Sequence, residues 1–437
     1  MRYNQVSSDP MEAIKEFSAQ TFSSLTVRNY RLYFIGQGFS HCGTWMQTVG
    51  LSWLVLVLTG SGTALGGVLA FRFMPMLVGG PFTGIIVDRF DKRTILYCTQ
   101  SIFAALSLSL AVLVYADLVE VWMLFAFALA FGMVDLVDHP TRQTFVHEMV
   151  GRDNLRNAVT LNGTEANLAR AIGPMIAGSL IATVGIAFCF FANAVSFVAL
   201  ILTLSFMRES ELHKEESTSK PNGHLFESIS YAISVPTIRT VLLSMAVIGT
   251  FAYEFQVSLP LLAEGTFAGV AADYAALLSA MGVGSVAGGL FAASRRKIAP
   301  HEFVISALLF GFSMGVTAIM PTLSLATVGM VFVGFFSINM TSLGNTMIQL
   351  EAAAHMRGSV MSLWAMAIFG STLIGAPIIG SIGQYIGPRW GLGLGGIAAM
   401  LAALYAARIL LKRDWFRLVP EAIEVRAGET EAEELKL

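Results

Sequence analysis

Residues 84–93 read GIIVDRFDKR, and five of these ten residues are charged. They follow residues 62–83, in which Arg72 is the only charged side chain. A group of charges placed directly behind a hydrophobic helix is too costly to enter hydrocarbon, so it stays at the membrane surface. The stretch therefore predicts a short loop between two membrane-spanning helices.

The composition favours a membrane protein over a large soluble domain. Of the 437 residues, 55% are hydrophobic and only 13% are charged, whereas a soluble domain carries about 25% charged residues. Many apolar runs approach ~20 residues, the length that a helix needs to cross a bilayer. The weak alternation typical of membrane β-strands is absent from these runs. The sequence thus predicts an all-α polytopic membrane protein.

Twelve membrane-spanning helices are expected, with breaks where Gly, Pro and charged residues cluster. Lys and Arg gather in the loops on one side of this arrangement, and the loops on the other side keep only Arg389. Because basic loops stay in the cytoplasm, both termini are expected there, in a multi-pass protein of a bacterial inner membrane. The expected spans are 31–58, 62–87, 94–115, 119–144, 160–184, 186–207, 237–262, 271–293, 301–320, 323–350, 358–385 and 389–411.

The longest polar stretch between spans divides them into six and six. The expected parts are a cytoplasmic N-terminal segment (1–30), a six-helix bundle (31–207), a cytoplasmic linker (208–236), a second six-helix bundle (237–411) and an acidic cytoplasmic tail (412–437). Three glycines of the first half recur in the second at a constant offset of 202 residues, which indicates an internal duplication. They are Gly173, Gly178 and Gly185, followed by Gly375, Gly380 and Gly387. Paired six-helix halves with a site between them are typical of transporters.

Several other classes of function find no support in the sequence. The net charge is −2 and no basic stripe suggests a nucleic-acid partner. Cys42, Cys98 and Cys189 match neither a disulfide framework nor a zinc site. No cleavable signal peptide is expected, because residues 1–27 are polar and the first apolar segment is too long. No P-loop pattern predicts ATP hydrolysis, and no nucleophile–base or metal-ligand motif predicts an enzyme.

The charged loop and the duplication together resemble the major facilitator superfamily. That family's loop between helices two and three reads roughly G-x-L-A-D-R-x-G-R-K. Gly84, Asp88, Arg89, Lys92 and Arg93 match it, whereas Asp91 replaces the second glycine. Four further segments, LTVRNYRLYFIGQ (25–37), GTWMQTVGLSWLVLVLTGSG (43–62), DHPTRQTFV (138–146) and RGSVMSLWAMAIFG (357–370), resemble the bacterial drug and siderophore exporter branch. The likeness runs from about residue 25 to residue 411 and implies two pseudo-symmetric six-helix bundles.

The resemblance implies that the charged loop latches the two halves together on the cytoplasmic side. The latch residues would be Gly84, Asp88, Arg89, Lys92, Arg93 and Arg142. A simpler interpretation stays open, in which the basic side chains only fix the topology and bind anionic headgroups.

Residues 169–178, ARAIGPMIAG, resemble the helix-five signature of drug antiporters, G-x-x-x-G-P-x-x-G-G. Gly173, Pro174 and Gly178 match, whereas Ala169 and Ala177 replace two glycines. The resemblance favours export over import. Close packing of small residues against a neighbouring helix explains the same pattern without antiport.

Ionisable residues within expected spans are candidates for function because they are costly there. Glu254 is the first proton-coupling candidate, since burial favours its neutral form and lets it load and release a proton; its alternative role is gating. Asp135, Asp138 and Arg170 are further candidates; alternatively, the two acids neutralise Arg142 or Arg170. His41 and Arg72 are cavity candidates, with structural packing as the alternative. Gln37, Gln47, Asn339, Asn345 and Gln349 are neutral cavity candidates, or make interhelical hydrogen bonds.

Taken together, these patterns predict a proton-coupled secondary exporter of a small amphipathic molecule such as a drug or siderophore, working by alternating access. Its expected partners are the cargo, protons and the bilayer; it is expected to be a monomer that uses the proton motive force and no cofactor or metal. A lipid or lysolipid flippase on the same fold and a non-transporting receptor remain alternatives, and a metal-ion carrier using His41 and Cys42 is a weaker one. The sequence does not identify the cargo.

Overall fold

The computed structural model describes residues 22–80, 83–213, 225–295, 299–353 and 356–411. Most of the N-terminal segment, part of the linker and the acidic tail expected at 412–437 lie outside these residues. Within them the regular secondary structure is entirely helical. The all-α prediction is therefore confirmed.

The described part of the first half of the chain contains six α-helices. They are α2 (Arg28–Thr59), α3 (Gly62–Gly79), α4 (Thr83–Arg89), α5 (Lys92–Tyr115), α6 (Val121–Thr183) and α7 (Ala187–Ser205). A short 3-10 helix, η1 (Ser23–Thr26), precedes them, and another, η3 (Glu209–Glu211), follows. The long α6 covers two expected spans, which are joined at Gly151, a residue with a φ of 66° that interrupts the helical backbone.

The second half begins with α8 (Leu225–Ser234), which lies inside the expected linker. It continues with α9 (Pro236–Ala252), α10 (Phe255–Phe267), α11 (Ala271–Ala293), α12 (Pro300–Ile319), α13 (Leu323–Glu351), α14 (Arg357–Ala365), α15 (Thr372–Tyr385) and α16 (Pro388–Leu410). A π-helical turn, η4 (Met366–Gly370), connects α14 to α15. Two expected spans of this half are thus continuous in sequence but broken in structure, one between α9 and α10 and the other at η4.

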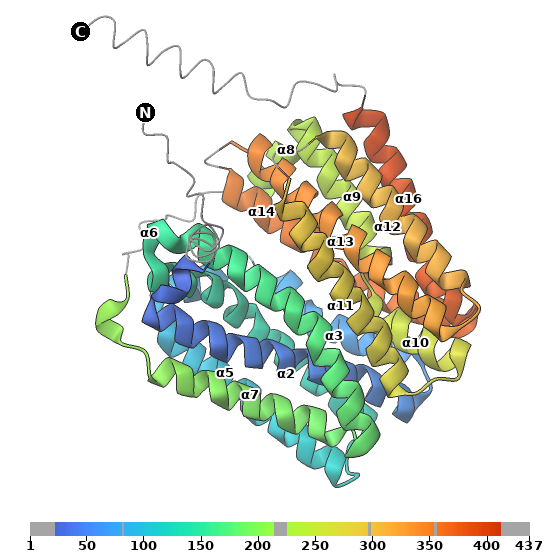
Figure 1. Cartoon of the computed structure of the whole chain (residues 1–437), viewed down its shortest axis with the longest axis horizontal. Helices are drawn as coiled ribbons and strands as arrows, with labels where there is room; N and C mark the ends of the chain where they lie inside the picture. The colour runs from blue at the N-terminus through green and yellow to red at the C-terminus, as the bar shows by residue number, and fades with distance from the viewer. Residues whose placement is uncertain (1–21, 81–82, 214–224, 296–298, 354–355, 412–437) are drawn as a thin grey trace, which may run out of the picture.

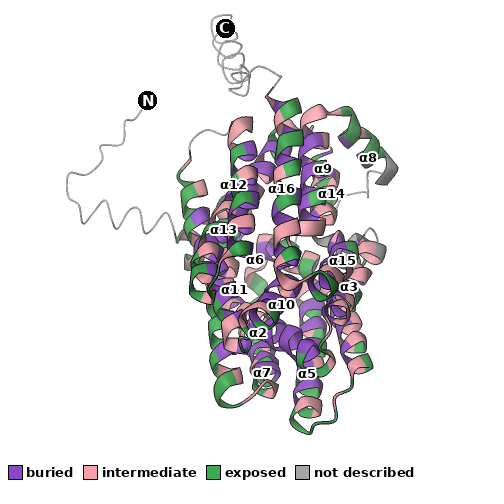
Figure 2. Cartoon of the chain, turned by 90° about the vertical axis from the view of Figure 1, so that its right-hand side faces the viewer, coloured by how far each residue is buried: buried purple, intermediate pink, exposed green. Residues whose placement is uncertain are grey.

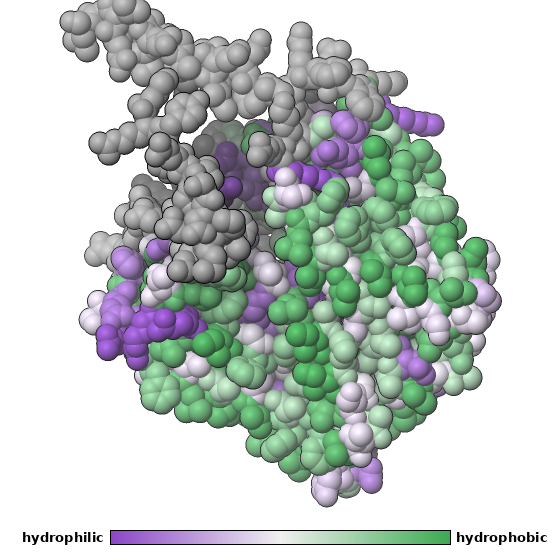
Figure 3. All heavy atoms as spheres, in the orientation of Figure 1, coloured by the Kyte–Doolittle hydropathy of each residue, from purple (hydrophilic) through white to green (hydrophobic). Residues whose placement is uncertain are grey.

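Every expected span coincides with helical residues. Ten helical segments of the described chain are long and apolar enough to cross a membrane, and Gly62–Leu77 is a shorter apolar helix. The part of α6 that follows Gly151 fills the remaining expected span. It is less apolar than the others because it carries Glu165 and Arg170. The face of the molecule seen in the space-filling view is largely hydrophobic over its coloured helices (Figure 3), as lipid contact requires.

The helices form two bundles that meet along two pairs of helices. α3 packs against α15, and α6 packs against α11. Figure 2 shows these four helices in the band between the bundles, with buried faces turned inward. Glycines permit the close approach: a Cβ on Gly66 would collide with the carbonyl of Ala376, and one on Gly282 would collide with the backbone of Ala171.

The duplicated glycines occupy equivalent places in the two bundles. Gly173 packs against α2, and Gly375 packs against α9, the corresponding helix of the second half. Gly178 packs across the interface against α11, and Gly380 packs across it against α3. The pseudo-symmetry expected from the sequence is therefore confirmed at the level of individual contacts.

The third glycine pair ends two equivalent helices. Gly185 has a φ of 101° and Gly387 a φ of 137°, so both adopt backbone conformations that side-chain-bearing residues rarely reach. Each follows a helix of the interface, α6 or α15, and precedes the last helix of its bundle. The same sharp turn is thus built twice.

The two bundles converge at one end and separate toward the other (Figure 1). At the convergent end, the Ser61 hydroxyl donates to Oε1 of Gln384 at 2.8 Å, and the backbone N–H of Thr63 donates to the same oxygen at 3.0 Å. The hydroxyls of Thr63 and Ser381 lie 3.2 Å apart. These bonds close the end that is reached after the first and the eleventh expected spans.

We expect Thr63→Cys combined with Ser381→Cys to form a disulfide readily, in a background where Cys42, Cys98 and Cys189 are replaced by Ser. The two hydroxyl oxygens lie 3.2 Å apart, so the sulfur atoms of cysteines at these positions start near each other and need only a small shift to reach the S–S bond length of about 2.05 Å. A protease site inserted in the linker makes the cross-link visible, because the cleaved halves stay joined on a non-reducing gel.

The matched control pairs Thr63→Cys with Ser362→Cys, because Ser362 is an exposed residue of α14. This pair should remain uncross-linked under the same oxidant. Equal cross-linking of the two pairs would contradict the closed end described here.

Candidate functional site

The residue that departs from the family's loop pattern has a local structural role. Asp91 is the N-cap of α5, and its carboxylate accepts hydrogen bonds from the backbone N–H and the hydroxyl of Thr94, both at 3.0 Å. Aspartate at this position satisfies a free N–H of the first turn and interacts favourably with the helix dipole. The substitution of the family's glycine therefore strengthens the start of α5.

The basic residues of the loop hold the first bundle together. Lys92 forms an ion pair of 2.7 Å with Glu148 of α6, and both side chains are mostly buried. The Arg93 guanidinium donates to the carbonyl of Leu204 at 2.7 Å, near the end of α7, and lies over the ring of Tyr97. A cation at a helix C-terminus satisfies carbonyls that have no helical partner.

The structure describes fewer contacts for the remaining residues of the expected latch. Arg89 is exposed and lies over the ring of Phe90. Gly84 and Asp88 belong to α4, but the Asp88 side chain and the surroundings of Gly84 fall outside what the structure describes. The contacts of Lys92 and Arg93 are made within one bundle, so the latch between bundles stays a prediction.

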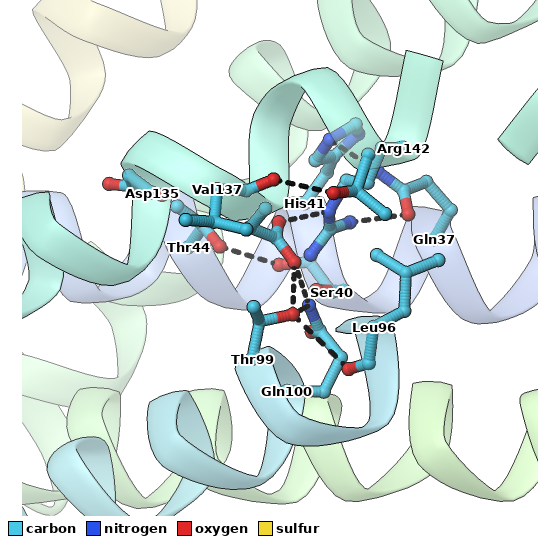
Figure 4. A network of polar contacts seen from close by, with 12 residues as sticks. Gln37, Ser40, His41, Thr44, Leu96, Thr99, Gln100, Asp135, Val137 and Arg142 are labelled. Atoms are coloured by element: carbon cyan, nitrogen blue, oxygen red, sulfur yellow. Dashed lines mark hydrogen bonds and ion pairs between the residues drawn. The ribbon is translucent and has the colours of Figure 1, made fainter. Parts of the chain in front are cut away.

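A buried polar network centres on Asp138 of α6 (Figure 4). Its Oδ1 accepts from the hydroxyl of Thr99 and from Nε2 of Gln100, each at 2.6 Å, and its Oδ2 pairs with the Nε of Arg142. Arg142 in turn donates to Oε1 of Gln37 on α2. The network joins α2, α5 and α6, and it places Asp138 with Arg142 rather than with Arg170.

The network continues to an acid that the sequence analysis did not single out. Nε2 of Gln37 lies 2.8 Å from Nε2 of His41, and Nδ1 of His41 lies 3.0 Å from both carboxylate oxygens of Glu165. The Glu165 side chain is 7% exposed and that of His41 31%. Glu165 lies within the expected span 160–184, so the criterion that selected Arg170 would have selected it as well.

Beside this network lies a cavity of about 220 Å³ in the first bundle. Arg72 of α3 and Asp135 of α6 face it as an ion pair of 3.1 Å, with the arginine also over the ring of Phe131. Charged, amide and aromatic side chains therefore meet in one space. The cavity is lined by His41, Thr44, Gln47, Arg72, Phe103, Phe131, Asp135, Asp138, His139, Arg142, Asn193 and Phe197.

The neutral candidates divide between cavity and packing roles. Gln47 lines the cavity and also bridges three helices, because its Oε1 accepts from Ser107 and from Asn193, both at 2.8 Å. Asn339 of α13 is buried and donates to a carbonyl of its own helix. Asn345 accepts from Gln349 at 2.5 Å on the same helix. These three residues of α13 do not line the cavity of the first bundle.

Glu254 occupies a special place in the second bundle. It stands at the break between α9 and α10, its residue is 2% exposed, and its Oε1 has no hydrogen-bond partner. Gly375 of α15 lies beside the carboxyl, and the hydroxyl of Thr372 interacts with it. A buried carboxylate without a cation is costly, so this group is suited to exchanging a proton.

Arg170 of α6 is isolated from acidic side chains. Its guanidinium lies 5.3 Å from the ring centroid of Trp45, and its buried Nε has no hydrogen-bond partner. Within the described residues no ion pair includes it. The sequence analysis selected this residue, but the structure does not give it the acidic partner that was considered.

The helix-five motif has a packing role in this structure. Gly173 lies against Cys42 and Trp45 of α2, and Gly178 against α11, while Pro174 interrupts the hydrogen bonding of α6.

The three cysteines are free, and the described residues contain no group of three His, Cys, Asp or Glu side chains that could hold a metal.

Family comparison covers nearly the whole chain. Residues 19–420 match the transmembrane secretion effector family of major facilitator transporters. The chain belongs to this family. It is accordingly a multi-pass membrane transporter, and the expectation that it is not an enzyme is confirmed.

Its curated relatives include two siderophore transporters. The chain is 24% identical over 340 residues to the staphyloferrin A transporter of Staphylococcus aureus, an alignment that spans 76% of this chain and 85% of the relative. It is 24% identical over 409 residues to the enterobactin exporter of Escherichia coli K12, spanning 90% and 94%. The resemblance to an exporter branch is thus supported over nearly the full length.

Solved structures share the fold at low sequence identity. A bacterial homologue of the human lysosomal transporter Spinster, inward-facing and unoccupied, superposes with a TM-score of 0.68 at 13% identity and covers 89% of this chain and 98% of its own. A peptide transporter in complex with sulfate gives a TM-score of 0.71 at 14% identity, covering 88% and 94%. These likenesses confirm the major facilitator fold.

Replacing Asp138 by Asn is expected to destabilise the protein more than replacing Asp135 by Asn. The Asp138 side chain is 5% exposed, and its neutralisation leaves Arg142 as an unpaired buried charge, which costs about 3–5 kcal/mol. The Asp135 side chain is 44% exposed, so water compensates for most of its lost ion pair. Thermal unfolding of the purified variants in detergent measures the difference.

The double variant Asp138→Asn with Arg142→Gln removes both charges and should recover part of the lost stability. If the Asp138→Asn variant unfolds at the same temperature as the wild type, the buried ion pair contributes nothing to the stability of the protein.

Proposed function

We propose that this transporter is a proton-coupled exporter of a small siderophore-like or drug-like molecule, working as an antiporter. The observation that carries the proposal is the set of ionisable side chains inside the membrane: an ionic network in the first bundle, and in the second the buried acid Glu254, whose Oε1 has no hydrogen-bond partner among the described residues. Ionisable side chains at this depth typically belong to cargo or proton pathways. The named roles of the staphyloferrin A transporter and the enterobactin exporter support export of this class of cargo.

The arrangement of the bundles supports alternating access. The bonds of Ser61 and Thr63 to α15 close one end, while the bundles separate toward the other. With both termini in the cytoplasm, the closed end faces outward and the open end faces the cytoplasm. Cargo then enters from inside the cell, and release requires the contacts between α3 and α15 to open.

Glu254 is the first candidate for the coupling proton. Its unpartnered oxygen lies against Gly375 of α15, the helix that forms part of the closed interface. Any shift of α15 changes the surroundings of the carboxyl, so its protonation and the movement of the bundle are linked through the same contact. The break between α9 and α10 gives the backbone around Glu254 freedom to adjust.

Glu165 with His41 is the second candidate. Nδ1 of His41 lies 3.0 Å from the carboxylate of Glu165, so the two side chains can hold a proton in a shared hydrogen bond. His41 also lines the cavity and contacts Gln37, which leads to Arg142 and Asp138. Cargo in the cavity is thereby connected through hydrogen bonds to a proton-binding pair.

We expect a pH gradient to drive cargo movement in proteoliposomes, with enterobactin and staphyloferrin A as the first probes. An acidic lumen should drive probe uptake as protons leave, and the ionophore nigericin should abolish it. Glu254→Gln should lower gradient-driven uptake about tenfold or more, in line with the contribution of a proton-transfer group, while passive exchange of the probe continues. Lumenal pyranine fluorescence reports the protons, and probe content reports the cargo.

The matched control is Glu264→Gln, because Glu264 is an exposed glutamate of α10. Glu264→Gln should transport the probe as the wild type does. Glu165→Gln tests the second candidate for the coupling proton separately from the first. Transport that ignores ionophores and both buried substitutions would overturn proton coupling. Lipid scrambling in the same vesicles, without probe movement, would instead favour a flippase.

A further inference from the structure

Arg170 lies where the two bundles meet. It belongs to the part of α6 that packs against α11, and a Cβ on Gly282 would strike the backbone of Arg170 and Ala171. The guanidinium is also close enough to Tyr253, at the end of α9, for electrostatic interaction. One cation thus faces a tyrosine of the opposite bundle, at the place where duplicated transporters hold their cargo.

Arg170 differs from the other membrane-embedded arginines described above in its lack of an acidic partner among the described residues. Arg72 pairs with Asp135 at 3.1 Å, and Arg142 pairs with Asp138. Arg170 has no acidic partner among the residues that the structure describes, and its Nε donates to none of them. A cation in this position is costly unless something neutralises it. The simplest explanation is that a partner from outside the polypeptide neutralises the charge of Arg170.

The surroundings of Arg170 select the kind of partner. The Trp45 ring lies against one side of the guanidinium, with 5.3 Å between the guanidinium carbon and the ring centroid. The Tyr253 hydroxyl lies 2.7 Å from the hydroxyl of Ser337 on α13, which fixes its position within the second bundle. The planar fork of an arginine matches a carboxylate, and aromatic rings beside it favour a flat ligand. The chemistry is that of an anion on an aromatic or apolar frame.

We propose that Arg170, Trp45 and Tyr253 form the anion-binding subsite for the cargo, so that the exported molecule carries a carboxylate or a comparable planar anion. This inference rests on the proposed transport function and assigns its substrate class. The subsite spans both bundles, because Arg170 and Trp45 come from the first and Tyr253 from the second. Bound cargo therefore joins the parts that must move against each other.

Salicylate and salicylamide test the subsite, because they have the same shape but only salicylate is an anion at pH 7. Equilibrium dialysis measures their binding to the full-length protein in nanodiscs of zwitterionic phosphatidylcholine. Salicylate should bind more tightly than salicylamide. Arg170→Gln should weaken salicylate binding about tenfold or more, as loss of a charged hydrogen bond implies, and leave salicylamide binding unchanged.

Two further variants make the test specific. Arg170→Lys keeps the charge without the planar fork, so it should bind salicylate with intermediate affinity, and it serves if Arg170→Gln does not fold. Arg389→Gln removes a guanidinium that also lies over an aromatic ring, Phe267, but already donates to the carbonyls of Ala318 and Met320. It should bind salicylate as the wild type does. Equal salicylate binding by Arg170→Gln and the wild type overturns the proposal.

Nanodiscs containing phosphatidylglycerol separate cargo from lipid as the source of the anion. If this lipid abolishes salicylate binding and co-purifies with the wild type but not with Arg170→Gln, the partner of Arg170 is a headgroup and the cargo assignment is wrong. The binding and transport measurements test separate proposals. If salicylate binding depends on Arg170 but a pH gradient drives no transport, the antiporter proposal is wrong and the subsite proposal stands.

Discussion

The structure depends on one constraint, which is that a charge inside the bilayer must have a partner that neutralises it there. Water is absent from the hydrocarbon region, so unsatisfied polar groups cost several kcal/mol each. The first bundle meets this constraint with the chain of contacts from Asp138 through Arg142 and Gln37 to His41 and Glu165. Helices that lie far apart in the sequence are thereby fixed in one arrangement, and the cavity takes its shape from them.

In lipid, close packing stabilises the association of helices, because hydrophobic burial does not. Lipid tails are as apolar as leucine, so helices associate through contacts that small residues allow. The equivalent contacts of Gly178 with α11 and of Gly380 with α3 show this solution used twice across the interface. Contacts between backbones have no long side chains to rearrange, so the two bundles can part and meet again with little repacking.

The sequence predicted the helices and the duplication and offered Arg142 as a partner of Asp138, but it did not predict the partners of the other charged residues. Apolar length identifies a span, and a repeated glycine spacing survives in the chain, so both were accessible. The pairing of His41 with Glu165 joins residues 124 positions apart, and it depends on which helix faces meet. The pairing of Lys92 with Glu148 depends on the same information. The breaks at Glu254 and at η4 also escaped prediction, because a hydropathy pattern records apolarity and not the continuity of hydrogen bonds.

The two bundles differ in a way that bears on how they move. The first, in which the span 62–87 is divided between α3 and α4, is cross-linked by ion pairs and hydrogen bonds between α2, α3, α5 and α6. The second contains two interrupted spans, α9–α10 and α14–α15. Interruptions in the helical hydrogen-bond ladder are where a helix bends most easily. Alternating access in this protein is therefore expected to be unequal, with a stiff bundle that carries the charges and a pliable one that bends around it.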